Sequence, residues 1–152
     1  MHQTVTAPVG APVAHVAEII ADLTTYPHWL DLVAAAERTS DGGDELPAWL
    51  VTIRAKVGPF ARSKKLRMVR TAHDVVDGMA MFRFERCETD GRDHSAWTLD
   101  ASVGPRAGAT TTSLVTMDLR YDGRLWTAPL EPILGSFIDD AGPGLEAYAT
   151  QG

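Results

Sequence analysis

The 152-residue chain has little cysteine and no long apolar run, and each absence narrows what the protein can be. Cys87 is its single cysteine, so no disulfide can form within the chain. No apolar stretch approaches the ~20 residues that a membrane-spanning helix needs. The first residues, MHQTVTAPVG, lack the basic segment and apolar core that mark a signal peptide. We therefore expect a cytoplasmic protein.

Sequence patterns for metal ions, nucleotides and serine nucleophiles are also missing. The segment LGSFI around Ser136 lacks the second glycine of the G-x-S-x-G motif. No phosphate-binding glycine loop and no dinucleotide fingerprint occurs. None of the histidines makes an HxH or HExxH spacing, so we expect no metal site and no cofactor. The histidines are His2, His15, His28, His73 and His94.

Length and composition fit a single globular domain. Hydrophobic residues make up 45% of the chain and charged residues 22%, which is ordinary for soluble proteins. A chain of this size buries roughly 68–70% of its unfolded surface, enough for a sizeable core. No repeat, low-complexity tract or interdomain linker occurs, so residues 1–152 are expected to form one domain.

Basic residues are concentrated in one segment of an otherwise acidic chain. The net charge is −6, yet Val51–His73 holds seven basic residues and no acidic one. The rest of the chain, with the other seven basic residues and all 20 acidic ones, therefore carries −13. The segment is either the solvated outer face of a hairpin or a docking surface for membrane lipid or RNA. Its basic residues are Arg54, Lys56, Arg62, Lys64, Lys65, Arg67 and Arg70.

The first part of the chain predicts a strand followed by two short helices. Residues 3–7 alternate in polarity, which indicates a strand. Pro12 suits a first helical position, and the apolar residues from Val16 to Leu23 recur at helical spacing. Pro27 disfavours helical geometry at the residue before it, so we expect it to end this helix. A second short helix is expected to start at Pro27 itself.

The middle of the chain predicts an antiparallel sheet. Here the apolar period changes to two, and Gly- and Asp-rich turns separate the alternating segments. Short strands joined by such turns imply a meander, whose apolar face a helix must cover. The six expected strands are 33–40, 48–58, 61–73, 79–88, 94–103 and 110–123.

The last segment, 125–150, supplies the covering helix. Its apolar residues fall three or four apart and form a long stripe. Pro143 lies inside this helix, where it removes a hydrogen bond and clashes with the carbonyl of Asp139, at about 3 kcal/mol. We expect a kink or a stop near Gly142. The stripe consists of Leu130, Leu134, Phe137, Ala141, Leu145 and Tyr148.

The order of these elements resembles the SRPBCC superfamily, also called the START-like or helix-grip proteins, over essentially the whole chain. The stretches AWTL and PLEPILGSF are similar to its polyketide-cyclase and coenzyme-Q-binding branches. The resemblance implies an α+β fold in which a curved antiparallel sheet of about seven strands wraps around a long C-terminal helix. It also implies a cavity between sheet and helix. The segments that carry the resemblance are APVAHVAEIIADLTTYPHWLDLV, VGPF, HSAWTLDA, TTTSLVTMDLRYDG and LWTAPLEPILGSFIDDAGPGLEAYA.

Candidate ligand-binding residues are those that such a fold turns toward its cavity. Trp29 follows Pro27 closely, so it either points into the cavity mouth or fills the core between the short helices and the sheet. Met residues give an adaptable wall. The candidates are Trp29, Leu30, Trp49, Ile53, Met68, Arg70, Phe82, Phe84, Arg86, Trp97, Met117, Tyr121, Ile133 and Phe137.

Two of these candidates are arginines on strand faces that otherwise carry apolar residues. An arginine on the concave face can hold a carbonyl, carboxylate or enolate of a ligand. Alternatively, Arg70 and Arg86 lie at strand ends that reach solvent, or Arg86 pairs with Glu88 and is structural. Tyr26, His28 and Tyr121 are the candidate proton donors near the cavity ends.

Three functional hypotheses remain open. In the first, the protein binds or transports a hydrophobic small molecule, such as a lipid, an isoprenoid quinone or an aromatic polyketide. In the second, it is a polyketide cyclase or aromatase, with Arg70, Arg86 or Tyr121 polarising the ligand. The scarcity of inward acid–base pairs favours binding. In the third, the basic hairpin contacts RNA or membrane. We expect no nucleic-acid partner and a monomer or homodimer, and transient contact with a membrane surface stays open as an alternative.

Overall fold

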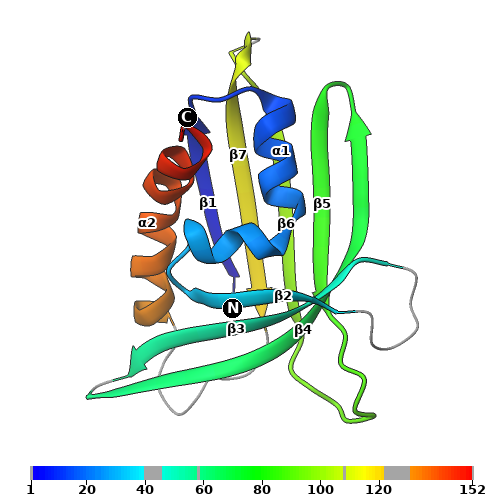
Figure 1. The fold of residues 1–152 in the computed structure, drawn as a ribbon, viewed down its shortest axis with the longest axis vertical. Coiled ribbons are helices and arrows are strands. Elements are labelled where there is room, and N and C mark those ends of the chain that lie inside the picture. Colours follow the sequence, from blue (N-terminus) through cyan, green and yellow to red (C-terminus); the bar gives the residue numbers. More distant parts are fainter. Residues whose placement is uncertain (1, 40–45, 58, 108, 122–130, 152) are drawn as a thin grey trace.

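The computed structural model describes residues 2–39, 46–57, 59–107, 109–121 and 131–151, with the backbone alone at 56, 57, 60, 109, 110 and 131–138. Strands and helices follow the expected order (Figure 1). The elements are β1 (His2–Val9), α1 (Val13–Ala21), the 3-10 helix η1 (Leu23–His28), β2 (Val33–Thr39), β3 (Ala48–Val57), β4 (Phe60–Val76), β5 (Met79–Arg86), β6 (Trp97–Arg106), β7 (Ala109–Tyr121) and α2 (Glu131–Ala149).

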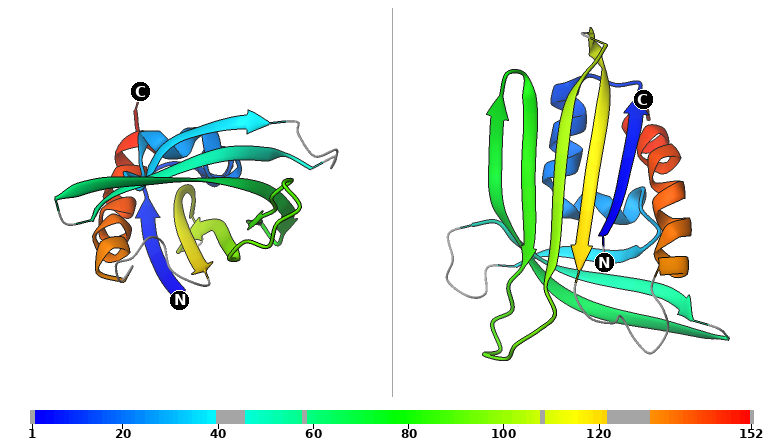
Figure 2. Two further views of the ribbon diagram at one scale, coloured as in Figure 1. Left: turned by 90° about the horizontal axis from the view of Figure 1, so that it is seen from below. Right: turned by 180° about the vertical axis from the view of Figure 1, so that it is seen from behind.

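The strands form one antiparallel sheet of seven, in the order β1-β7-β6-β5-β4-β3-β2. The long strand β4 joins its two halves, because residues 60–69 pair with β3 and residues 68–76 pair with β5. The register shifts between Arg70 and Ala72, and such a bulge bends a strand. As a result β3 and the start of β4 run crosswise to β5, β6 and β7 (Figure 2). The predicted curved sheet is confirmed.

Helix α1 and the helix η1 cover the concave face, though their boundary differs from the expected one. Val16, Ile19 and Ile20 are the buried face of α1, which packs over β5, β6 and β7. The helix ends at Ala21, well before Pro27, because the Asp22 carboxylate accepts a hydrogen bond from the backbone N–H of Thr24 at 3.0 Å. This cap starts η1, and Pro27 lies inside η1 rather than opening the second helix.

The C-terminal helix α2 continues through Pro143, so of the kink or stop expected near Gly142, the stop does not occur. Its described second half packs against β1, with Ala141, Leu145 and Ala149 buried. This burial offsets the cost of the internal proline. In the described part of the chain, no helix is long and apolar enough to cross a bilayer.

Candidate functional site

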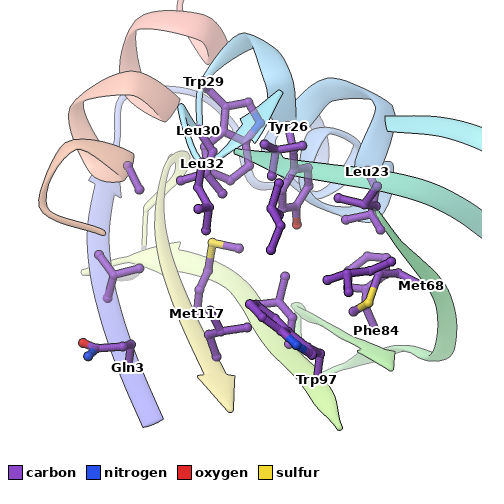
Figure 3. Close-up of a pocket in the computed structure, with 18 residues that line it drawn as sticks. Gln3, Leu23, Tyr26, Trp29, Leu30, Leu32, Met68, Phe84, Trp97 and Met117 are labelled. Atoms are coloured by element: carbon purple, nitrogen blue, oxygen red, sulfur yellow. The ribbon is translucent and has the colours of Figure 1, made fainter. Parts of the chain in front are cut away.

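An apolar cavity of about 110 Å³ lies between the concave face of the sheet, the segment around η1 and helix α2 (Figure 3). All seven strands contribute to its wall, from Gln3 and Val5 on β1 to Val33 on β2. Helix α2 contributes Ala141 among its described side chains. Trp29 and Leu30 close the cavity from one side, while Trp97 and Met117 reach into it from the sheet.

Half of the predicted site residues lie in the cavity wall. Two of them are adjacent in the segment after η1, and the others come one from each of β3 to β7, where the alternation of inward and outward side chains turns them toward the cavity. That they bind a ligand stays a prediction. The predicted residues in the wall are Trp29, Leu30, Ile53, Met68, Phe84, Trp97 and Met117.

Two further candidates, Trp49 and Phe82, lie on the concave face outside the cavity wall. Trp49 is buried and packs edge-on against Phe84, with ring centres 5.7 Å apart, and Arg38 covers its face at 5.1 Å. Phe82 is also buried and packs against the ring of His73 at 4.7 Å. The side chains of Ile133 and Phe137 lie outside the described residues.

Arg70 shares the inward face of β4 with Met68 but turns to the end of helix α1. Its Nη1 donates a hydrogen bond to the carbonyl oxygen of Ala21 at 2.9 Å. That carbonyl is one of the last in α1, where the helix dipole favours a cation. Burial lowers the pKa of Arg70 and nearby Arg38 lowers it further, but the guanidinium keeps its charge at neutral pH. In the structure, therefore, Arg70 caps a helix.

Arg86 is held by the connection between β5 and β6. Its Nε lies 3.0 Å from Glu88 Oε1, and its side chain is only 5% exposed. Nη1 also donates to the carbonyl oxygen of Ser95 at 3.3 Å. The ion pair with Glu88, one of the three possibilities that the sequence left open for Arg86, is therefore present. In this arrangement Arg86 anchors the chain that leaves β5.

Of the three candidate proton donors, Tyr26 reaches the cavity wall. Its hydroxyl donates a hydrogen bond to the carbonyl oxygen of Ile20 at 2.9 Å. Burial raises the pKa of Tyr26 far above its usual value, and the charge of Asp22 raises it further. The phenol is therefore neutral, and its proton takes part in the hydrogen bond to Ile20.

The other two donors lie elsewhere. Tyr121 is buried and stacks on Trp97, with ring centres 5.0 Å apart. His28 is exposed and stacks on Tyr148 at 5.4 Å. Residues 2–39, 46–57, 59–107, 109–121 and 131–151 contain no cluster of three His, Cys, Asp or Glu side chains that could hold a metal ion.

The arrangement of sheet, short helices and C-terminal helix is shared with solved structures. A START superfamily protein from Mycobacterium smegmatis superposes with a TM-score of 0.72 at 14% identity, covering 97% of this chain and 96% of that one. Human StAR-related lipid transfer protein 5 gives 0.79 at 11% identity, covering 99% and 76%. The Zhui aromatase/cyclase from Streptomyces sp. R1128 gives 0.63 at 14% identity, covering 98% and 93%.

The chain has the START-like, helix-grip fold. The resemblance predicted from the sequence is thereby confirmed at the level of the fold. Neither a protein-family model nor a curated protein sequence matches the chain. At identities this low, the START-like fold fixes the architecture and leaves the ligand open.

Several residues in the wall of this START-like cavity were missed from the sequence. Four of them lie two positions from a predicted residue on the same strand, so an extended alternation would have found them. Gln3 carries no such signal, because a polar residue on β1 does not stand out. Ala141 belongs to the apolar stripe of the last helix but was not among the candidates. The neighbours two positions away are Val51, Leu66, Leu99 and Leu119.

Proposed function

We propose that the protein binds a hydrophobic small molecule in the cavity between the sheet and α2. The observation that carries this proposal is the wall itself, which all seven strands build from inward-facing apolar side chains. Apolar cavities remain free of water and take up apolar molecules. Solved structures with this fold include a lipid transfer protein and an aromatase/cyclase, which supports a hydrophobic ligand in general.

The size of the cavity limits what it holds without rearrangement. Its volume of about 110 Å³ is below the ~150 Å³ of an engineered cavity that takes up benzene. Pockets for drug-sized ligands usually measure ~300–1,000 Å³. A lipid, an isoprenoid quinone or an aromatic polyketide therefore requires α2 and the Trp29 segment to move apart. We propose that Trp29, Leu30, Met68 and Met117 then contact the ligand.

The wall favours binding over the alternative of a polyketide cyclase or aromatase. A cyclase needs a general acid or base within hydrogen-bond reach of its substrate. Among the described wall residues, Tyr26 alone has an ionisable side chain, and its hydroxyl is hydrogen-bonded to Ile20. Arg70 and Arg86 are likewise engaged with Ala21 and Glu88.

Filling the cavity tests the proposal directly. Ala141→Leu adds a larger side chain to the wall from α2, and we expect it to weaken the binding of the apolar dye Nile red at least tenfold. The thermal midpoint should be unchanged or higher, because the new methyl groups enter empty space.

Ala101→Leu is the matched control, since Ala101 is equally buried but does not line the cavity. We expect it to lower stability through overpacking by about 1–3 kcal/mol while dye binding persists. Nile red binding that is the same in Ala141→Leu as in the unsubstituted protein would contradict the proposal.

A further inference from the structure

The hairpin of β3 and β4 carries the basic segment to the edge of the molecule. Its tip lies beyond the N-terminal end of α2 (Figures 1 and 2). The two strands pair from Ala48 with Val69 at the base to Val57 with Phe60 at the tip. The base belongs to the cavity wall through Val51, Ile53 and Leu66, so the tip extends outward from the cavity.

Positive charge surrounds this hairpin on both faces. Arg54 lies opposite Ser63 and Lys65 lies opposite Thr52, which puts both basic residues on the outward face. Arg62 lies opposite the inward-facing Ala55, on the other face, and is also exposed. Within the described part of the chain, neither Arg54 nor Lys65 is in an ion pair. The charged groups of both side chains are therefore exposed to solvent.

An exposed apolar side chain accompanies these charges. Leu50 is 40% exposed and lies two positions from Thr52 on the same outward face as Arg54. Pro59, at the turn of the hairpin, is exposed as well. Basic side chains beside exposed apolar ones match the interfacial layer of a bilayer, where anionic headgroups border acyl chains.

We propose that the β3–β4 hairpin docks the protein on anionic membrane surfaces, with Arg54 and Lys65 of its outward face at the lipid headgroups. The local charge overcomes the net charge of −6, because screening confines electrostatics to about 8–10 Å at physiological salt. Docking by the hairpin brings one wall of the apolar cavity next to the bilayer. Membrane docking does not depend on the cavity being filled, so the docking proposal and the ligand-binding proposal are tested independently.

A membrane fits this surface better than single-stranded RNA does. RNA-binding surfaces of this kind combine basic residues with aromatic rings on which bases stack. Among the side chains described on β3 and β4, the aromatic ones are Trp49 and His73, and Trp49 is buried. Leu50 supplies an aliphatic contact instead, which suits lipid.

The test measures binding of the whole protein to vesicles of phosphatidylcholine with and without about a third phosphatidylserine. We expect binding to the anionic vesicles only, with affinity falling steeply between about 50 and 200 mM salt. Arg54→Glu and Lys65→Glu should each weaken it at least about fivefold. Thermal midpoints identify a variant that fails to fold, and Arg54→Gln and Lys65→Gln then serve as milder replacements.

Arg106→Glu is the matched control, because Arg106 is exposed at the far end of β6 and undergoes the same charge change. We expect it to bind the anionic vesicles within twofold of the unsubstituted protein. Equal losses in Arg106→Glu and Lys65→Glu would overturn the proposal, as would affinity that is flat with salt. So would binding of a labelled single-stranded RNA in the absence of vesicle binding.

Discussion

Gly144 of α2 lies directly against the backbone carbonyl of Trp29. A Cβ atom at position 144 would stand 2.3 Å from that oxygen, closer than real Cβ atoms come to other heavy atoms. The helix can approach the segment after η1 only because residue 144 has no side chain. Since Trp29 and Ala141 both line the cavity, this contact holds together two parts of its wall.

Gly144→Ala is expected to push α2 away from Trp29 and to lower the thermal midpoint. The Trp29 carbonyl is backbone and cannot rotate aside, so the strain falls on the packing of the helix. Gly142→Ala is the matched control, because its Cβ would meet only Ala7 Cβ at 3.2 Å. There the helix-propensity gain of about 1 kcal/mol should offset the crowding. Equal thermal midpoints for the two variants would show that position 144 has room for a Cβ atom, which would contradict this contact.

Trp29→Ala is expected to destabilise the protein by about 3–5 kcal/mol, the usual cost of truncating a buried aromatic side chain. Trp29 is 5% exposed, and its ring packs against Tyr26 with centres 4.5 Å apart. Urea unfolding measures the loss, and Nile red binding on the same variant reports the cavity. Trp29→Phe should retain most of the stability. Unchanged stability with weakened dye binding would show instead that Trp29 is a mobile lid.

Arg70→Met is expected to lower stability by about 1–2 kcal/mol, because it removes a charged hydrogen bond from the end of α1. Arg38→Met is a matched control. Both guanidinium groups lie over the ring of Trp49, at 5.9 and 5.1 Å, but only Arg70 has a hydrogen bond to α1. Arg38→Met should lower the free energy of unfolding by about 0.5–1 kcal/mol. If Arg70→Met abolishes Nile red binding without lowering the urea midpoint, Arg70 is a ligand-binding residue.

Asp118 links β7 to β1 and makes stability depend on acid pH. Hydrogen bonds from Thr4 and His2 hold the pKa of Asp118 below its ordinary value of 3.8. A depressed pKa in the folded state contributes stability above the unfolded value, and this contribution disappears as pH falls through the folded value. Asp118→Asn should therefore lower the urea midpoint near pH 7 and have little effect near about pH 2.

The control for this pH profile is Asp93→Asn, which removes an exposed carboxylate from the β5–β6 connection. Its effect on the urea midpoint should be small at every pH. A difference between Asp118→Asn and the unsubstituted protein that is the same at neutral and acid pH would contradict the assigned role of Asp118.

The fold could be predicted from the sequence because period-two alternation and turn residues are local signals. They place Ile53, Met68 and Met117 on one face of the sheet, where the structure has them. The extent of α2 could not be predicted this way. Pro143 signals a stop, but burial of residues such as Leu145 against the rest of the fold outweighs the local cost.

The sequence did not indicate where along each strand the cavity would lie. Trp49 and Phe82 share the inward face with Phe84, yet only Phe84 lines the cavity. Helix α1 covers part of that face, over β5, β6 and β7, and its placement follows from tertiary packing. The same holds for Arg70, since its hydrogen bond depends on where α1 ends.

The central claim, that this cavity binds a hydrophobic small molecule, is tested most directly by native mass spectrometry. The protein is incubated with a total lipid extract of its own host and its mass is compared with that of Ala141→Leu treated in the same way. The account predicts a bound apolar molecule on the unsubstituted protein that is reduced or absent on Ala141→Leu. Bare masses for both proteins, or the same adduct on both, would contradict it.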